Sequence, residues 1–156
     1  MRVLFMCTAN SCRSILSEAM FNHLAREGFE AVSAGSFPKG QVLPRSLTTL
    51  QQAGIAIDGL YSKGNDAFEG NPPDIVITVC DKAAGETCPV YFGPAIKCHW
   101  GLEDPSDVTG DEAAVDAAFR ATLAIIERRC ATFLGLPFKS LSRVELQREL
   151  DRIGSL

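Results

Sequence analysis

Short apolar runs alternate along this chain with longer segments of helical periodicity. Apolar runs at residues 2–6, 29–34, 74–79 and 95–100 predict buried strands. Residues 15–26 and 44–53 predict helices, each followed by a glycine, and the first of them is expected to be amphipathic. Capping boxes at Thr109/Glu112 and Ser142/Glu145 predict two further helices, ending near residues 133 and 153. The alternation predicts an α/β domain with a mostly parallel sheet.

Composition narrows the class of protein. The chain has 156 residues, enough for one core, and we expect a single domain over 1–156. A formal net charge of −4 without a run of Lys or Arg argues against a general nucleic-acid binder. The sequence has no apolar stretch long enough to span a bilayer and no signal-peptide pattern, so we expect a cytoplasmic protein with reduced thiols. The six cysteines therefore favour a redox or nucleophilic role.

The most informative segment is Cys7-Thr8-Ala9-Asn10-Ser11-Cys12-Arg13-Ser14, between the first strand and the first helix. Unpaired N–H groups and the helix dipole converge there, so this segment predicts a cradle for an anion. Such a cradle favours the thiolate of Cys7, and Ser14 can donate a hydrogen bond to its sulfur. Arg13 offers a two-pronged donor to a tetrahedral oxyanion. The alternative is a structural turn with a buried free cysteine.

Two further cysteines follow the third predicted strand. In a parallel sheet, ligands bind at the carboxyl ends of strands, so Cys80 and Cys7 can share one site. Cys88 lies beyond a polar segment that contains Gly85, and a Cys80–Cys88 disulfide is compatible with this spacing. The alternative is a buried Cys80 with an incidental Cys88. A zinc site is not supported, because no set of four ligands is evident.

Asp104, which precedes Pro105, is a candidate acid that could protonate a leaving oxygen. Glu103 and Asp107 compete with it on sequence alone, and a solvated turn is the structural alternative. Of the remaining cysteines, Cys12 lies within the predicted cradle. Cys98 on a strand and Cys130 on a helix are expected to be ordinary core residues.

These motifs resemble arsenate reductases built on the low-molecular-weight tyrosine phosphatase fold. The resemblance rests on the Cys7–Ser14 loop, on Thr78-Val79-Cys80 with Cys88-Pro89, and on His99-Trp100-Gly101-Leu102-Glu103-Asp104-Pro105. It covers Met1 to about Arg129, and residues 131–156 look like a helical tail of some bacterial members. It implies a three-layer sandwich with a central four-stranded sheet, mostly parallel and flanked by helices.

The resemblance also implies a chemistry. Cys7 attacks arsenate held by Arg13 and by the loop Thr8, Ala9, Asn10, Ser11, Cys12, Arg13 and Ser14, and Asp104 protonates the departing oxygen. Redox-active disulfides Cys7–Cys80 and then Cys80–Cys88 follow, and thioredoxin, or glutaredoxin as the alternative, regenerates the enzyme. The resemblance implies neither a cofactor nor a resident metal, and a monomer is expected.

Some family members hold a potassium ion near the loop. Asn10, Glu18 and Ser33 match three of its ligands, whereas Lys63 stands near the fourth position. An ammonium group there could replace the charge of the ion, so we expect activity that does not depend on potassium.

Two other functions compete with arsenate reduction. A low-molecular-weight tyrosine phosphatase would use Cys7, Arg13 and an aspartate through a phosphocysteine. Against it, the Asp-Pro pair lies about fifty residues before the end rather than close to it, Ser106 replaces a common aromatic, and two cysteines have no role. A redox-sensing or oxyanion-binding module is the non-enzymatic alternative, and it would form one disulfide per chain without turnover.

Overall fold

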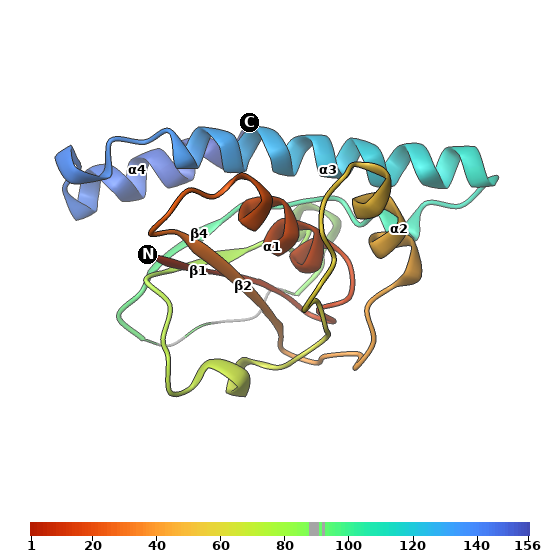
Figure 1. Ribbon diagram of the computed structural model, residues 1–156, viewed down its shortest axis with the longest axis horizontal. Helices are drawn as coiled ribbons and strands as arrows, with labels where there is room; N and C mark the ends of the chain where they lie inside the picture. The colour runs from red at the N-terminus through yellow and green to blue at the C-terminus, as the bar shows by residue number, and fades with distance from the viewer. Residues whose placement is uncertain (88–90, 92) are drawn as a thin grey trace.

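A four-stranded parallel sheet forms the centre of the molecule in the computed structural model, which describes residues 1–87, 91 and 93–156 (Figure 1). The strand order is β2-β1-β3-β4, and every neighbouring pair is parallel. The strands are β1 (Arg2–Cys7), β2 (Glu30–Gly35), β3 (Ile75–Thr78) and β4 (Ile96–His99). Each begins and ends within one residue of the predicted bounds. The predicted parallel sheet flanked by helices is confirmed.

The α-helices lie on one face of the sheet, and a 3-10 helix contributes to the cover of the other. The helices are α1 (Arg13–Leu24), α2 (Pro44–Gln52), α3 (Glu112–Leu134) and α4 (Arg143–Ile153). Figure 1 shows α3 running along the top of the molecule with α1 between it and the sheet. The 3-10 helix η1 (Asn65–Phe68) packs Phe68 on the opposite face. The site described below lies where β1 and β3 end and α1 begins.

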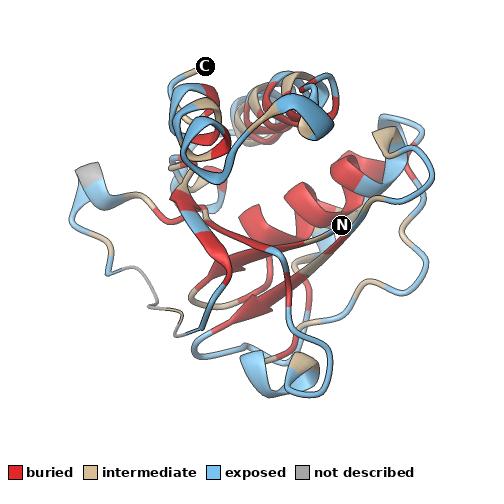
Figure 2. Ribbon diagram, turned by 90° about the vertical axis from the view of Figure 1, so that its left-hand side faces the viewer, coloured by how far each residue is buried: buried red, intermediate tan, exposed pale blue. Residues whose placement is uncertain are grey.

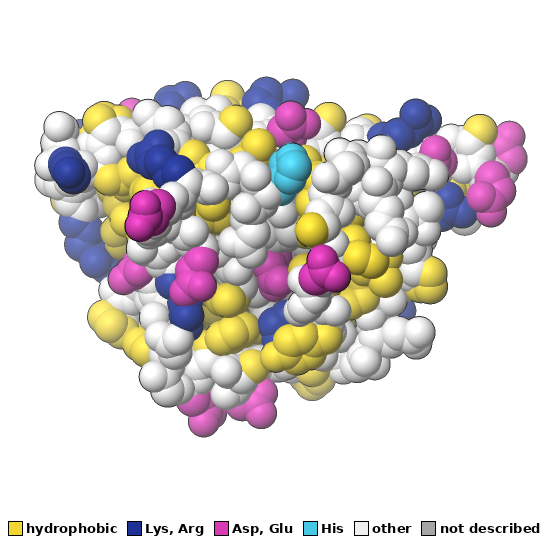
Figure 3. All heavy atoms as spheres, in the orientation of Figure 1, with side chains coloured by type: hydrophobic (Ala, Val, Ile, Leu, Met, Phe, Trp, Pro, Cys, Tyr) yellow, Lys and Arg dark blue, Asp and Glu magenta, His cyan; other side chains and the backbone are white. Residues whose placement is uncertain are grey.

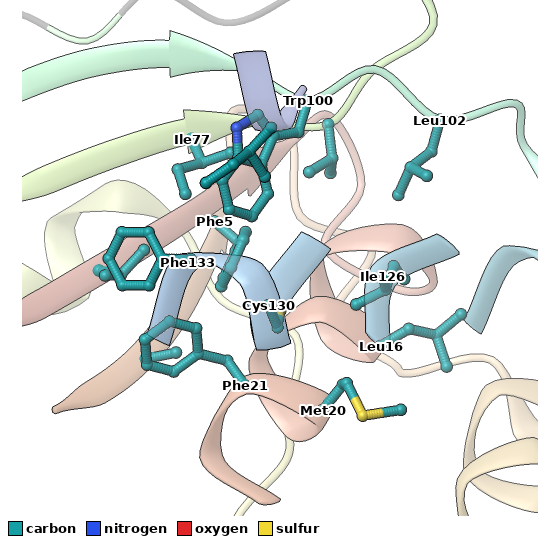
Figure 4. Close-up of a cluster of buried hydrophobic side chains, with 14 of the residues drawn as sticks. Phe5, Leu16, Met20, Phe21, Ile77, Trp100, Leu102, Ile126, Cys130 and Phe133 are labelled. Atoms are coloured by element: carbon teal, nitrogen blue, oxygen red, sulfur yellow. The ribbon is translucent and has the colours of Figure 1, made fainter. Parts of the chain in front are cut away.

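Aromatic side chains join the sheet to its helical layer (Figure 4). The ring of Phe5 on β1 lies 6.0 Å from that of Phe21 on α1, and Phe21 lies 5.5 Å from Phe133 on α3. Trp100 closes the cluster from the segment after β4, at 6.1 Å from Phe5. Tilted and edge-on ring pairs of this kind add to the large hydrophobic gain from burying the rings.

Helix α1 departs from the sequence prediction of an amphipathic helix. Its first nine residues, Arg13 to Phe21, are all buried, whereas Asn22 and His23 near its end are exposed. Most of this helix is accordingly red in Figure 2. The physical reason is its position, because the sheet covers one side of α1 and α3 covers the other. Burying a polar side chain is costly unless it is paired. The buried Arg13, Ser14 and Glu18 therefore need partners, which the site supplies.

The helix starts are only partly as predicted. The capping box of Ser142 and Glu145 is present at the start of α4. The predicted box at Thr109 is wrong, because the side chain of Asp111 caps α3 by accepting from the Ala114 N–H at 2.8 Å. Gly110 has a φ of +130°, outside the helical region, so the helix can begin only after it.

The C-terminal segment is fastened to the segment that follows β4. The Trp100 indole N–H donates to the Leu150 carbonyl at 2.9 Å. The Arg129 guanidinium donates to the carbonyls of Gly101 and Gly154, both at 3.0 Å. Residues 131–134 complete α3, and α4 then returns along β4. This arrangement supports the start of the segment that leads to Asp104.

The surface carries charges of both signs. On the face shown in Figure 3, basic and acidic side chains are interspersed among polar and apolar ones. Within the described part of the chain, none of the helices has the length and apolar character needed to cross a membrane.

Candidate active site

The loop between β1 and α1 surrounds the Cys7 sulfur with hydrogen-bond partners. The Ser14 hydroxyl oxygen lies 2.8 Å from Cys7 Sγ, and the Asn10 backbone N–H donates to the same sulfur at 3.3 Å. Asn10 has a φ of +48°, a left-handed conformation that asparagine tolerates better than most residues. Because α1 begins at Arg13, its N-terminus also faces this loop. The structure thus brings the predicted cradle residues around Cys7.

Asn10 determines the direction of the hydrogen bond between Ser14 and Cys7. Its side-chain amide donates to the hydroxyl oxygens of Ser14 and Ser33, each at 2.9 Å. Since Ser14 Oγ accepts from Asn10, its own hydrogen is left to point at the Cys7 sulfur. A donated hydrogen bond favours the thiolate over the thiol, and the thiolate is the nucleophilic form.

A buried charge pair supports Asn10 from behind. Ser33 donates to Glu18 Oε1 at 2.6 Å, and the Lys63 ammonium lies 3.5 Å from the same oxygen and 3.4 Å from Ser33 Oγ. The Lys63 backbone N–H donates to Asn10 Oδ1 at 2.9 Å. The ammonium therefore stands among the side chains that the resemblance associates with potassium. Because Lys63 already balances the charge of Glu18, these residues do not fit a potassium ion.

Burial lowers the pKa of Lys63, because desolvation disfavours the ammonium form, and the nearby Glu18 carboxylate offsets this only in part. The ammonium also donates to the Tyr61 carbonyl at 2.9 Å. Lys63 and Glu18 are thus a hydrogen-bonded ion pair beneath the cradle, with a chain of hydrogen bonds that runs through Ser33, Asn10 and on to the Cys7 side of the loop.

The outer side of the cradle is held by backbone hydrogen bonds from two neighbouring segments. The carbonyls of Thr8, Ala9 and Ser11 accept from the backbone N–H groups of Phe37, Lys39 and Leu43 at 2.9, 3.0 and 3.0 Å. At the end of β2, a Cβ on Gly35 would collide with the Thr8 carbonyl and would lie 2.9 Å from the Asn10 nitrogen. Glycine at this position therefore lets β2 approach the loop closely. Thr8, Ala9 and Ser11 contribute to the cradle through their backbone.

The Arg13 guanidinium closes the far end of the cradle and is nearly inaccessible, with 7% of its side chain exposed. Nη1 and Nη2 donate to the two carboxylate oxygens of Glu86 at 2.6 and 2.7 Å. Nη1 also donates to the Leu102 carbonyl at 3.1 Å, and Nη2 lies 3.4 Å from Asp104 Oδ2.

These contacts change the ionisation of both partners. Burial opposes the charge on Arg13, but its hydrogen bonds and charge interactions with Glu86 and Asp104 outweigh this effect and raise its pKa. The hydrogen bond from Arg13 lowers the pKa of Glu86, with a further contribution from the Asp81 N–H. Both groups are therefore charged at neutral pH, and the ion pair is fully formed.

Asp104 is the carboxylate of its segment that reaches Arg13. Its Oδ1 accepts from the backbone N–H and the hydroxyl of Ser106, at 2.9 and 2.6 Å, and this leaves Oδ2 directed at Arg13. Glu103 and Asp107 are exposed instead. Of the three acids that compete on sequence grounds, the structure brings Asp104 to the cradle.

Cys80 lies at the same edge of the sheet as Cys7. β1 and β3 are neighbours, with Met6 opposite Thr78, and the Val79 N–H continues the ladder to the Met6 carbonyl at 3.0 Å. Cys80 is buried and disulfide-bonded, whereas Cys7 is a free thiol. Cys88, and with it the predicted Cys80–Cys88 pairing, lies outside the described residues. A Cys7–Cys80 disulfide is not formed in this state.

The other three cysteines are buried thiols. Burial raises the pKa of Cys12 to about 12 and that of Cys130 to about 12, and it raises the pKa of Cys98 as well. Each therefore stays protonated at neutral pH and is a poor nucleophile. Cys98 on β4 and Cys130 on α3 are core residues, as predicted. Cys12 packs at the start of α1, near Ser46.

Sequence reasoning missed Glu86, the carboxylate with the shortest contacts to Arg13. The two residues are 73 positions apart, and Glu86 stands in a polar segment without a periodic pattern. Its only signal is its place six residues after Cys80, in the segment that the two redox cysteines were predicted to enclose.

Comparison with known proteins identifies the family to which the chain belongs. The chain belongs to the low molecular weight phosphotyrosine protein phosphatase family, whose model matches residues 2–150. Within that class, an arsenate reductase of Halalkalibacterium halodurans is 31% identical over 131 residues, which make up 84% of this chain and 93% of that protein. The resemblance to arsenate reductases of this fold is therefore confirmed.

Solved structures agree. An arsenate reductase from Archaeoglobus fulgidus superposes with a TM-score of 0.71 at 27% identity, covering 86% of this chain and 99% of that one. A thioredoxin-dependent arsenate reductase of Corynebacterium glutamicum gives a TM-score of 0.56 at 29% identity, covering 80% of this chain and 57% of that one. In the described part of this chain, no three His, Cys, Asp or Glu residues are grouped so that they could hold a metal ion.

Proposed function

We propose that the protein reduces arsenate to arsenite, with the Cys7 sulfur as the nucleophile. The observation that carries this proposal is the hydrogen-bonded Cys7 at the mouth of a helix N-terminus, with Arg13 and Asp104 at the far end of the same cradle. Cys80 follows the neighbouring strand and is disulfide-bonded here, so its reduction provides a second thiol at the same edge of the sheet as Cys7. The arsenate reductases among the relatives support the choice of oxyanion.

The first step forms a bond between sulfur and arsenic. Arg13 and the loop N–H groups hold the arsenate oxygens, and the Cys7 thiolate attacks the arsenic atom. A hydroxyl group of hydrogen arsenate leaves as water after it takes one proton from Asp104. The product of this step is a Cys7 thioester of arsenic in its +5 state, so no electrons have yet been transferred.

The second step transfers the electrons. The Cys80 thiolate attacks the Cys7 sulfur, and the electron pair of the breaking sulfur–arsenic bond stays on arsenic, which leaves as arsenite. Arsenic gains two electrons, and the two cysteines lose two by forming the Cys7–Cys80 disulfide. Cys88 then attacks Cys80, so that Cys7 is released as a thiol and the oxidising equivalent is held in a Cys80–Cys88 disulfide.

An external dithiol completes the cycle by reducing the last disulfide to two thiols while it is itself oxidised to a disulfide. We propose thioredoxin for this role, which the similarity to a thioredoxin-dependent arsenate reductase supports. Glutaredoxin is the alternative donor. The structure with Cys80 disulfide-bonded and Cys7 free corresponds to the state that this donor would meet.

A phosphatase function is not favoured. A phosphocysteine route would use Cys7, Arg13 and Asp104 in similar roles, but it would leave Cys80 without one. The arsenate reductase relatives also point the other way. Because phosphate and arsenate share shape and charge, weak phosphatase activity is still expected from this cradle.

The experiment that tests the proposal measures NADPH consumption on adding arsenate to the protein with thioredoxin and thioredoxin reductase. Sustained, arsenate-dependent turnover is expected for the wild type and for Cys98→Ala, a control cysteine outside the site. Cys88→Ser should stop after about one turnover per chain, because the Cys7–Cys80 disulfide then has no resolving thiol. Wild-type turnover that occurs only with glutaredoxin would reassign the donor, and hydrolysis of phosphate esters without arsenite formation would overturn the proposal.

A further inference from the structure

Glu86 occupies the Arg13 guanidinium, the group to which the substrate binds in the proposed mechanism. Its two carboxylate oxygens accept hydrogen bonds from Nη1 and Nη2 of Arg13, at 2.6 and 2.7 Å, in a two-pronged geometry. Leu102 and Asp104 accept from the same two nitrogens. The four hydrogens on these nitrogens therefore meet four acceptors. A tetrahedral oxyanion that binds Arg13 with two prongs must displace a carboxylate to do so.

The charges around Arg13 also oppose the binding of an oxyanion. Glu86 and Asp104 place two negative charges on one guanidinium, and 25% and 23% of their side chains remain exposed. An arriving arsenate or phosphate anion therefore meets an overcompensated arginine. Repulsion between like charges in a partly buried site is much less screened than in water.

The position of Glu86 depends on the backbone that follows Cys80. The Glu86 N–H donates to the Asp81 carbonyl at 3.0 Å, and the Asp81 N–H donates to Glu86 Oε2 at 2.8 Å. Between them lie the 3-10 helix η2 (Lys82–Ala84), capped by the Asp81 side chain, and Gly85 with a φ of +83°. This closed turn begins at the residue next to Cys80, which is disulfide-bonded here.

We propose that Glu86 is an internal competitor of the oxyanion, held on Arg13 while Cys80 is in a disulfide and released when that disulfide is reduced. Reduction by a dithiol breaks the sulfur–sulfur bond of Cys80 and gives two protein thiols, while the dithiol becomes a disulfide. The turn after Cys80 is then free to move, and Glu86 leaves Arg13. This inference rests on the proposed function and adds a means of regulation to it. The oxidised enzyme would not rebind oxyanion until its disulfide is reduced.

The test is the affinity for inorganic phosphate, measured by isothermal titration calorimetry. Phosphate has the shape and charge of arsenate, and it does not oxidise thiols, so the measurement requires no turnover. The samples are the oxidised protein, with Cys7 shown to be free by thiol counting, and the fully reduced protein. Glu86→Gln removes the charge with little change in volume. Glu103→Gln, an exposed acid that takes no part in the Arg13 ion pairs, controls for net charge.

Oxidised Glu86→Gln is expected to bind phosphate at least about tenfold more tightly than oxidised wild type, equivalent to about 1.4 kcal/mol. Reduction should tighten binding to wild type by a similar factor and leave Glu86→Gln nearly unchanged. Equal or weaker binding by oxidised Glu86→Gln would overturn the proposal and would make Glu86 a residue that orients Arg13. If this variant does not fold, an unchanged wild-type affinity on reduction overturns it equally. Absence of arsenite formation would instead count against the proposed function, whatever the phosphate affinities are.

Discussion

Replacing Lys63 with methionine is expected to destabilise the protein by about 3 kcal/mol, the low end of what breaking a buried ion pair costs. Lys63 and Glu18 have only 8% and 11% of their side chains exposed, and Nζ lies 3.5 Å from Glu18 Oε1. Methionine keeps the length of the side chain and removes its charge. The Glu18 carboxylate is then left buried without its ion-pair partner, although the Ser33 hydroxyl still donates to it at 2.6 Å.

The magnitude follows from two opposing effects. At 3.5 Å, the Coulomb attraction is about 5 kcal/mol at an effective dielectric constant of 20. The variant also lacks the ammonium group, so the free-energy cost of burying it is absent. That burial is the main cause of the lowered pKa of Lys63. Because this cost offsets much of the attraction, we expect the low end of the range for breaking a buried ion pair, about 3 kcal/mol, which for a chain of this length corresponds to a fall in Tm of about 6–12 °C.

A double-mutant cycle with Glu18→Gln isolates the pair. Urea unfolding would be measured for the wild type, both single variants and the double variant. We expect the double variant to be more stable than Lys63→Met alone, because it has no unpaired buried charge. A loss below about 1 kcal/mol for Lys63→Met, or strict additivity, would refute the account of the pair.

Wild-type arsenite formation is expected to be equal in potassium and sodium salts, and a several-fold activation by potassium would contradict the role given to the Lys63 ammonium.

Three further outcomes are expected. Cys12→Ser should keep its rate of arsenite formation within about threefold of wild type, because burial raises the pKa of this thiol to about 12 and leaves it unreactive; a hundredfold loss would contradict this. Burial and the charges of Lys82 and Arg129 lower the pKa of His99, so its contribution to stability is complete above about pH 6.5 and is lost as the pH falls. The stability of wild type relative to His99→Asn in urea should therefore decrease from about pH 7.5 to 5.5, and an increase would show the opposite sign. Asp104→Asn should slow arsenite formation by about 10²-fold or more in a single-turnover assay, and an unchanged rate would remove Asp104 from proton transfer.

The sheet and the nucleophile loop could be predicted because their signals are local. The strands are short apolar runs bounded by glycine, proline or polar residues, and the Cys7–Ser14 loop joins such a run to a helix. The capping box of Ser142 was predictable for the same reason. The predicted box at Thr109 does not form, because the φ of Gly110, which the sequence does not reveal, makes Asp111 the cap of a helix that begins at Glu112.

The electrostatics of the site depend on contacts between distant parts of the chain. The Arg13–Glu86 pair joins residues 73 positions apart, and the Lys63–Glu18 pair joins residues 45 apart. Neither separation produces a periodic pattern. Lys63 drew attention through the family resemblance, whereas Glu86 had no such guide. The burial of every α1 residue from Arg13 to Phe21 was missed as well, because it depends on the packing of α3 against this helix.

In the proposed mechanism, Cys7 and Cys80 together supply the two electrons that reduce arsenate. The most direct measurement is arsenite released by the fully reduced protein in a single turnover without thioredoxin, together with the loss of free thiols. We predict about one arsenite and the loss of two thiols per chain for the wild type, the same for Cys98→Ala, and no arsenite for Cys7→Ser or Cys80→Ser. Arsenite released by Cys80→Ser at the wild-type rate, or arsenite formed by Cys7→Ser, would contradict the account.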